Sequence, residues 1–279
     1  MGTSAETNDL PENEAVSRRP LLTRLAMAGR VPGLIARRDH VSRAAARALG
    51  VTAIGLEGGR ERGWIDRIEE RREELASERT AVAPDFDPAA GGVTGSWFAG
   101  IDGPVPIWGI ARMFSIPPAW GAFLLRLIRE LSPSSCLELG TGLGLSAAYQ
   151  AAALELNGAG SLVTLEGADA WAAVAEQGLD ELGLAGRARV ERGSIDDVLP
   201  PLAAERAPID YAFLDADHSE EATVKHYGMI EPHLASGGIV LLDDVTHSDD
   251  MRRAWESIGS SRRASGRLEL GRMGLVTIE

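Results

Sequence analysis

A glycine-rich turn between a short apolar strand and a helix constrains this chain more than any other feature. Residues 136–146 read Cys-Leu-Glu-Leu-Gly-Thr-Gly-Leu-Gly-Leu-Ser, so Gly140, Gly142 and Gly144 recur at every second position. Glycines in such a turn allow positive φ and let a ligand approach the backbone, and the helix that follows offers unpaired N–H groups. Dinucleotide-binding turns have the spacing G-x-G-x-x-G, and Leu145 stands where their third glycine would be. The run predicts a ligand-binding turn and speaks against NAD; a glycine turn without a ligand is the plainer alternative.

Length, charge and apolar content are consistent with a soluble enzyme. The 279 residues suffice for one large α/β domain and a smaller appendage, and a hydrophobic content of 44% supplies a core. The net charge of −13 argues against a nucleic-acid partner. No apolar run approaches the roughly 20 residues that span a bilayer, and the polar amino-terminus does not resemble a signal peptide. We therefore expect no membrane partner and a cytoplasmic location. Cys136 is the one cysteine, so no internal disulfide can form.

The chain divides into an amino-terminal appendage and a carboxyl-terminal α/β domain. Residues 1–17 are polar and acidic and are expected to be a disordered tail. Residues 18–110 are expected to form a helical appendage and a lid, with arginine-rich amphipathic helices first and a charged helix over 63–79. The arginine-rich face is expected to be solvated, and a homodimer through these helices is a further option. Residues 111–279 then form the main domain.

From residue 119 onward, helical and extended patterns alternate. The expected strands cover 134–139, 161–166, 187–192, 209–215 and 238–243, and each is followed by a helix. Near-continuous apolar strands that alternate with helices predict a parallel sheet buried on both faces. Two short strands near 266–270 and 273–278, joined by a turn with glycines, predict an antiparallel addition at one edge. Ligands of such sheets bind outside the carboxyl ends of the strands.

Polar residues stand at several of these strand ends. Glu138 comes at the end of the first strand of the alternating region, and Glu166 ends the second. A carboxylate at the position of Glu166 can accept hydrogen bonds from both ribose hydroxyls of a nucleoside, although an ordinary surface glutamate is the plainer alternative. Gly193 and Ser194 follow the third strand, where they would lie against an adenine ring or form only a turn.

Two further strand ends carry aspartates. Phe-Leu-Asp-Ala-Asp-His covers 213–218 and Leu-Leu-Asp-Asp-Val covers 241–245, so Asp215 and Asp243 are one strand–helix–strand unit apart. Adjacent parallel strands then place these carboxylates side by side, with Asp244 next to them. Clustered carboxylates repel one another unless a cation or a proton lies between them, and Mg²⁺, Ca²⁺ and Mn²⁺ prefer such oxygen ligands. The pattern predicts a divalent-metal site.

The acidic residue and the glycine turn together, Glu-x-Gly-x-Gly-x-Gly, resemble motif I of class I S-adenosylmethionine (SAM) methyltransferases. The order of helices and strands is similar to the fold of that family. The resemblance implies an α/β, Rossmann-like seven-stranded sheet over the main domain, an amino-terminal helical appendage, and SAM as the cofactor. The cofactor contacts that it implies are Glu138, Gly140, Thr141, Gly142, Gly144, Ser146, Glu166, Gly193, Ser194 and Asp215.

The aspartate pattern resembles the metal-dependent catechol and caffeoyl-CoA type O-methyltransferases, and also the macrolide-sugar O-methyltransferases. Asp215 and Asp243 match, whereas Asp244 stands where the catechol type has asparagine, and His218 stands where it has a catalytic lysine. The resemblance implies a divalent cation, Mg²⁺ or Mn²⁺, held by the three aspartates. His218 is then expected to be the general base, because an unperturbed imidazole has a pKa of about 6.5. A histidine that only contacts the cofactor is the alternative.

Three functions remain open at this point. The first is the metal-assisted O-methylation of a small-molecule hydroxyl by SAM. The second is a metal-independent SAM methyltransferase that acts on N, S or O. The third is a non-catalytic or NAD-binding Rossmann-like protein, which Leu145 disfavours. In the first two, the acceptor pocket is expected to be bordered by Trp97, Phe98, Trp108 and Met113–Ile116.

Overall fold

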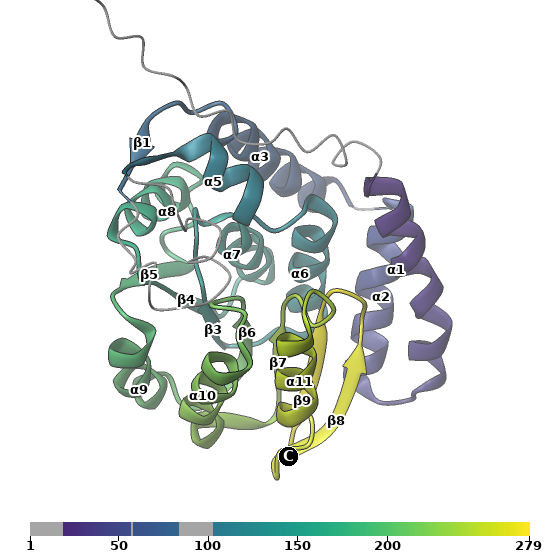
Figure 1. The fold of residues 1–279 in the computed structure, drawn as a ribbon. Coiled ribbons are helices and arrows are strands. Elements are labelled where there is room, and N and C mark those ends of the chain that lie inside the picture. Colours follow the sequence, from purple (N-terminus) through teal and green to yellow (C-terminus); the bar gives the residue numbers. More distant parts are fainter. Residues whose placement is uncertain (1–18, 57, 84–102) are drawn as a thin grey trace, which may run out of the picture.

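A seven-stranded mixed sheet forms the centre of the molecule (Figure 1). The structure is a computed structural model that describes residues 19–56, 58–83 and 103–279. The strands of the sheet are β3 (Ser135–Leu139), β4 (Ser161–Glu166), β5 (Ala188–Arg192), β6 (Ile209–Leu214), β7 (Leu234–Leu242), β8 (Ala264–Glu269) and β9 (Gly274–Ile278). Their order is β5-β4-β3-β6-β7-β9-β8; β3 to β7 are parallel, whereas β9 runs antiparallel to both β7 and β8. The expected parallel sheet with an antiparallel edge is thus confirmed.

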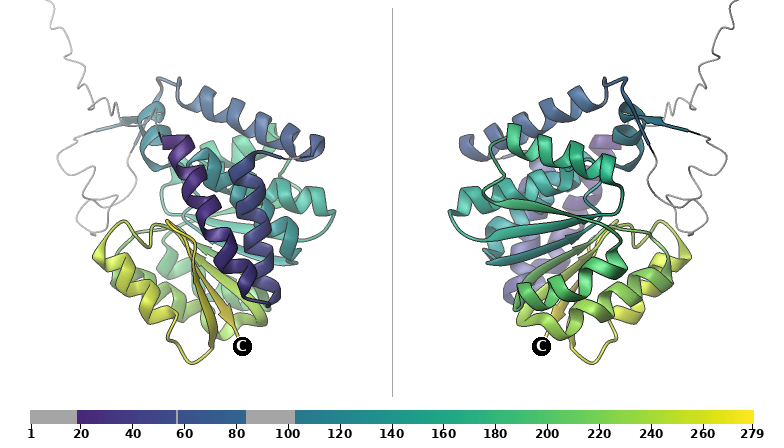
Figure 2. Two further views of the ribbon diagram at one scale, coloured as in Figure 1. Left: turned by 90° about the vertical axis from the view of Figure 1, so that its right-hand side faces the viewer. Right: turned by 90° about the vertical axis from the view of Figure 1, so that its left-hand side faces the viewer.

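Helices cover both faces of this sheet (Figure 2). One layer contains α6 (Pro118–Leu131), α7 (Leu145–Asn157) and α8 (Asp169–Glu181). The other layer contains α9 (Ile195–Arg206), α10 (Glu220–Ile230) and α11 (Asp249–Ile258). Strand side chains alternate between the layers: Cys136 and Phe213 join the apolar cluster of α6 to α8, and Leu137 and Leu139 join that of α9 to α11. The central strands β3, β4, β6 and β7 therefore place apolar side chains on both faces of the sheet.

The expected amino-terminal helices are present and pack against the main domain. They are α1 (Arg19–Ala36), α2 (His40–Ile54) and α3 (Gly59–Leu75), followed by the short strands β1 (Ala81–Val82) and β2 (Val105–Pro106) and by α5 (Ile107–Phe114). Figure 2 shows α1 and α2 side by side along one flank of the sheet layers. Met27, Leu49 and Ile68, one from each of the first three helices, are buried in the same cluster as α6 and α7. The appendage therefore shares a core with the sheet.

A buried arginine ties this appendage to α6. Arg126 is almost fully buried; its Nε donates to Glu61 Oε1 of α3 at 2.6 Å, and its Nη1 donates to Thr52 Oγ1 of α2 at 2.7 Å. A buried guanidinium has to be paired with a carboxylate or other acceptors, because an isolated buried charge is very costly. Two appendage helices supply those acceptors.

Some element boundaries differ from expectation for local reasons. The helix expected over 63–79 is α3, which starts at Gly59 and ends at Leu75. The helix expected after the strand over 209–215 ends at Ile230, where a short 3-10 turn containing Pro232 follows, since proline has no N–H to continue a helix. The strand expected from residue 238 starts at Leu234, because Leu234 already pairs with Ile209 of β6.

No helix among the described residues combines the length and the apolarity that crossing a membrane would require. The lid residues Trp97 and Phe98 lie outside the described residues.

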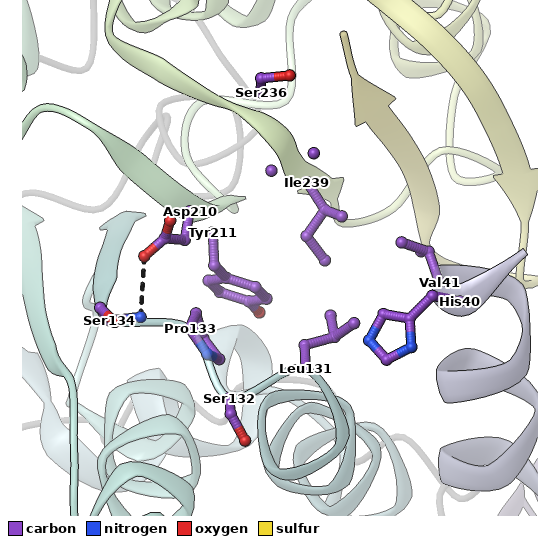
Figure 3. Close-up of a pocket in the computed structure, with 12 residues that line it drawn as sticks. His40, Val41, Leu131, Ser132, Pro133, Ser134, Asp210, Tyr211, Ser236 and Ile239 are labelled. Carbon is purple, nitrogen blue, oxygen red and sulfur yellow. Dashed lines mark hydrogen bonds between the residues drawn. The ribbon is translucent and has the colours of Figure 1, made fainter.

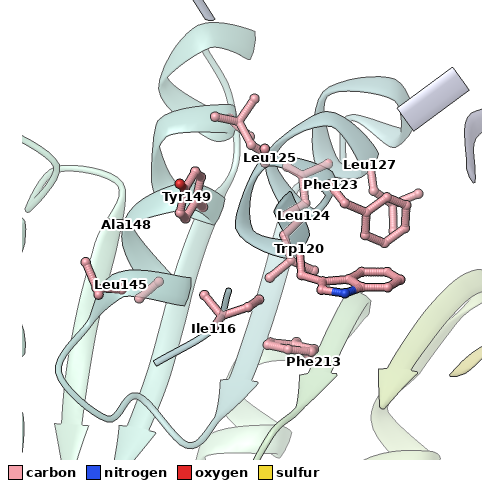
Figure 4. Packing of buried hydrophobic residues seen from close by; sticks show 14 of the residues in the cluster. Ile116, Trp120, Phe123, Leu124, Leu125, Leu127, Leu145, Ala148, Tyr149 and Phe213 are labelled. Atoms are coloured by element: carbon pink, nitrogen blue, oxygen red, sulfur yellow. The ribbon is translucent and has the colours of Figure 1, made fainter. Parts of the chain in front are cut away.

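The contact between α6 and α7 generates a prediction about stability. A Cβ atom on Gly121 of α6 would lie 2.3 Å from the Tyr149 ring of α7, and Figure 4 shows Tyr149 among the packed residues of this cluster. We expect Gly121→Ala to lower the free energy of unfolding by about 1–3 kcal/mol, the usual effect of overpacking a core. Denaturant unfolding followed by circular dichroism measures this.

Gly228 provides the matched control, because it is an exposed helical glycine of α10 with nothing within 4 Å of an added Cβ. Gly228→Ala is expected to raise the free energy of unfolding by up to about 1 kcal/mol, since alanine favours helix. Equal effects of the two substitutions would contradict the proposed close contact.

Candidate active site

The main-chain register brings the carboxyl ends of four parallel strands to one edge of the sheet. Leu139 of β3 pairs with Leu165 of β4 and with Leu214 of β6. Leu214 pairs in turn with Leu242 of β7. The residues that follow these four positions along the chain are Gly140, Glu166, Asp215 and Asp243. The structure therefore gathers the predicted turn and the predicted acidic residues at one edge, where open α/β sheets bind their ligands.

The three glycines of the turn have three different surroundings. All have positive φ, at 93° for Gly140, 54° for Gly142 and 86° for Gly144. A Cβ on Gly140 would lie 2.1 Å from the Asp215 carbonyl oxygen, and a Cβ on Gly144 would lie 2.9 Å from the Ala175 Cβ of α8. At Gly142 an added Cβ would meet nothing within 4 Å. Gly140 and Gly144 thus permit close packing within the protein, and Gly142 alone leaves open space for a ligand.

Glu166 holds this turn from the end of β4. Its Oε2 accepts from the Gly142 N–H at 2.7 Å, and its Oε1 accepts from the Ala168 N–H at 2.9 Å. Burial raises the pKa of the Glu166 carboxyl, and these N–H donors act in the opposite direction. Gly193 lies next to it, because the Gly193 N–H donates to the Glu166 carbonyl oxygen at 3.0 Å. The adjacent Ser194 is exposed at the start of α9.

The other polar residues of the motif lie beneath the turn. Glu138 is fully buried, and its Oε1 accepts from Gln150 Nε2 of α7 at 2.6 Å. Burial raises the pKa of Glu138 to about 8, although hydroxyl groups, including that of Ser146, oppose the rise. The Thr141 hydroxyl lies 2.6 Å from that of Thr164, inside the protein. Glu138, Thr141 and Ser146 therefore support the turn from the core side, rather than standing at an open strand end.

The aspartates and His218 form a second group at the same edge. His218 Nε2 lies 3.3 Å from Asp215 Oδ1 and 3.7 Å from Asp244 Oδ2. His218, its neighbour Asp217 and Asp244 all have positive φ, at 59°, 62° and 54°. Such conformations are uncommon outside glycine and cost about 1–3 kcal/mol each, and they concentrate at functional sites. The backbone is thus held in a strained form where the predicted catalytic groups meet.

An arginine that the sequence analysis missed occupies the centre of this group. Arg272 lies in the turn between β8 and β9; its Nε donates to Asp243 Oδ1 at 2.6 Å and its Nη2 to Asp243 Oδ2 at 2.5 Å. The same Nη2 donates to Asp244 Oδ2 at 3.2 Å. Asp243 is completely buried, so the guanidinium supplies the charge that its carboxylate needs. The sequence carried one signal for Arg272: the expected antiparallel strands at the sheet edge place the turn that contains Arg272 beside the end of β7.

The acidic group as arranged does not fit a divalent cation. Both oxygens of Asp243 and one oxygen of Asp244 already accept from Arg272. Within the described ranges, no three or more His, Cys, Asp or Glu residues are grouped so that they could hold a metal ion. The expected cation on Asp215, Asp243 and Asp244 is therefore not confirmed.

The charges of this group change the role expected of His218. Burial and the charge of Asp243 raise the pKa of Asp215 to about 7. Burial alone would lower the pKa of His218, but Asp215 and the carboxylates of Asp244 and Asp243 outweigh it and raise that pKa to about 9. His218 is thus an imidazolium at neutral pH, whereas the sequence analysis assumed an unperturbed imidazole.

The described lid residues lie on the appendage side of the sheet. Trp108 is flanked by two guanidinium groups, with Arg79 and Arg112 at 5.5 and 5.4 Å from its ring centroid. Phe114 packs against Trp171 of α8, with the ring centroids 5.8 Å apart. Trp108 therefore contributes to the junction of α5 with its neighbours, and its role in an acceptor pocket stays a prediction.

A hollow of about 230 Å³ lies elsewhere, near the amino ends of β6 and β7 (Figure 3). Leu131, Tyr211 and Ile239 line it together with His40 of α2. None of the predicted site residues lines this hollow, so it does not belong to the strand-end group.

Comparisons with known proteins agree with this geometry. Residues 137–245 match a family model described as a methyltransferase domain. A catechol O-methyltransferase of Niastella koreensis is 40% identical over 104 residues, which cover 37% of this chain and 46% of that protein. A solved O-methyltransferase from Bacillus cereus, in complex with SAH, covers 69% of this chain and 100% of its own, with a TM-score of 0.54 and 21% identity. Cofactor-bound Rv0187 from MTB covers 60% of this chain and 82% of its own, with a TM-score of 0.52 and 27% identity.

The matched segment contains the strand-end residues of the site, although Arg272 lies beyond it. It begins in β3, contains the glycine turn and Asp215, and ends just after the Asp243–Asp244 pair. The chain spans about half the length of the curated relatives it matches. Residues 137–245 are therefore similar to a methyltransferase domain.

Proposed function

We propose that this chain transfers the methyl group of SAM to a hydroxyl oxygen of a small-molecule acceptor. The observation that carries the proposal is the open space at Gly142, next to the carboxylate of Glu166, at the strand-end edge of the sheet. The similarity to O-methyltransferases over the same segment supports transfer to oxygen. The divalent cation expected from the sequence is not part of this proposal; a homodimer through the amino-terminal helices and a cytoplasmic location stay predictions.

The residues of the turn fit a nucleoside cofactor. Gly142 leaves the ligand side of the turn free of side chains, and Glu166 offers acceptor oxygens for ribose hydroxyls. Gly193 and Ser194 would border the adenine. When bound, SAM supplies a methyl group that its sulfonium already activates, so the protein has mainly to orient donor and acceptor.

The aspartates and His218 at the strand ends would accept the proton that leaves the acceptor hydroxyl. His218 Nε2 lies 3.3 Å from Asp215 Oδ1 and 3.7 Å from Asp244 Oδ2, and these carboxylates stabilise its charged form. We propose His218 as the group that takes the proton. Because its pKa is about 9, the fraction of neutral imidazole rises as the pH approaches that value.

The cofactor assignment is tested by a substitution at Gly142. We expect Gly142→Val to weaken SAM binding by roughly 10- to 100-fold, because the side chain would fill the space left for the ligand. Calorimetry with SAM measures the affinity, and a thermal-shift comparison with NAD tests the competing dinucleotide hypothesis. Gly183→Val is the matched control, since Gly183 also has positive φ and open space but lies beyond α8. Unchanged SAM affinity in folded Gly142→Val would refute the assignment.

The role of His218 is tested by the pH dependence of the rate. Since the raised pKa keeps His218 protonated below about 9, kcat should increase as the pH rises from 7 toward 9. His218→Gln should lower kcat by roughly 10²–10⁴-fold and flatten this profile, with SAM affinity little changed. SAH release with a panel of hydroxylated acceptors measures the rate. His40→Gln, at the exposed start of α2, is the control and should retain the profile. A normal profile in His218→Gln would assign the proton to another group.

A further inference from the structure

We infer that Arg272 is the built-in cation of this site, which neutralises the strand-end carboxylates so that methyl transfer proceeds without a divalent metal. The inference rests on the proposed function and adds to it the identity of the group that balances the charge. Three carboxylates at neighbouring strand ends repel one another unless a positive charge lies among them. The structure provides that charge from the chain itself.

The geometry of the ion pair is the first support. Arg272 reaches Asp243 with two parallel N–H donors, from Nε and Nη2, one to each carboxylate oxygen. This fork arrangement is the strongest and most directional that an arginine and a carboxylate can form. The Nη2 group also donates to Asp244, so one guanidinium serves both members of the aspartate pair.

The backbone around Arg272 is the second support. The Val245 N–H donates to the Arg272 carbonyl oxygen at 2.8 Å, which fastens the turn to the segment that carries the aspartates. The Leu270 N–H donates to the Met273 carbonyl oxygen at 2.9 Å and closes the turn itself. Leu242 pairs with Gly274, two residues after Arg272. The guanidinium is therefore positioned by main-chain hydrogen bonds on both sides of the ion pair.

The consequence for metal binding follows from the donor set. Mg²⁺ and Mn²⁺ need several oxygen ligands, and both oxygens of Asp243 already accept from the Arg272 guanidinium, whose positive charge would repel a metal ion. A cation that entered would have to displace Arg272 and leave a mostly buried guanidinium without these acceptors, which is unfavourable. Removing the guanidinium should conversely free the carboxylates for a metal.

The experiment titrates Mn²⁺ into the full-length protein by calorimetry after exhaustive dialysis against EDTA. We expect Arg272→Met to bind Mn²⁺ at least about tenfold more tightly than the wild type, because both oxygens of Asp243 would lose their cationic partner. The matched control is Arg253→Met on α11, which removes an exposed arginine paired with Glu220 and Asp250. It should bind Mn²⁺ no better than the wild type. If Arg272 had only a structural role, its replacement by methionine would not create a metal site.

Measurements of SAM affinity and of SAH release in the presence of EDTA distinguish a failure of this inference from a failure of the proposed function. Tight, stoichiometric Mn²⁺ binding by the wild type that Asp243→Asn abolishes would overturn the inference, as would SAM-dependent turnover that requires Mn²⁺. A folded Arg272→Met variant with wild-type Mn²⁺ affinity would overturn it too. A wild type that binds no SAM under any condition would instead refute the proposed function.

Arg272→Lys covers the case in which Arg272→Met does not fold. Lysine keeps the charge but loses the two-pronged contact. A folded Arg272→Lys variant that still turns over in EDTA and takes up no Mn²⁺ supports the inference, and one that needs Mn²⁺ for turnover contradicts it.

Discussion

The parallel register of β3, β4, β6 and β7 is the constraint on which the rest of the site depends. Each strand ends within one residue of its neighbours, so groups that lie far apart in the sequence meet at a single edge. The close approach of Gly140 to the Asp215 carbonyl group shows how tight this meeting is, because it leaves no room for a side chain. The turn and the acidic group are therefore parts of one rigid arrangement.

Polar groups on both sides of the sheet end maintain that arrangement. Glu166 accepts a hydrogen bond from the Gly142 N–H on the outside of the turn, and Glu138 lies beneath the turn, where it accepts from Gln150. The Asp243–Arg272 ion pair attaches the antiparallel edge to the end of β7. Gly142 thus faces the space for a ligand, whereas Glu138 supports the turn from the core. The regular spacing of the glycines does not reveal this difference.

Much of the fold could be predicted from the sequence because its signals are local. The α7 and α11 helices follow their strands as expected, with Gly144 and Ser248 directly before them, and β4 covers the expected 161–166. Glu138 was misplaced at an open strand end, although the period of two would have set it on the same buried face as Cys136. Arg272 was missed, because its partner is 29 residues away and is reached only through the pairing of β7 with β9. The pKa of His218 likewise depends on carboxylates that come from different strand ends.

The buried contacts of Arg126 bear on where the functional unit of this chain begins. The segment that matches methyltransferase domains starts in β3, yet the guanidinium on α6 takes its acceptors from Thr52 and Glu61. A piece trimmed to the matched segment would lose α6, and one trimmed to start at α6 would lose the partners of Arg126 and expose the apolar cluster that Met27, Leu49 and Ile68 share with α6 and α7. The appendage is thus an internal component of the fold, and the smallest autonomous unit reaches back at least to α2.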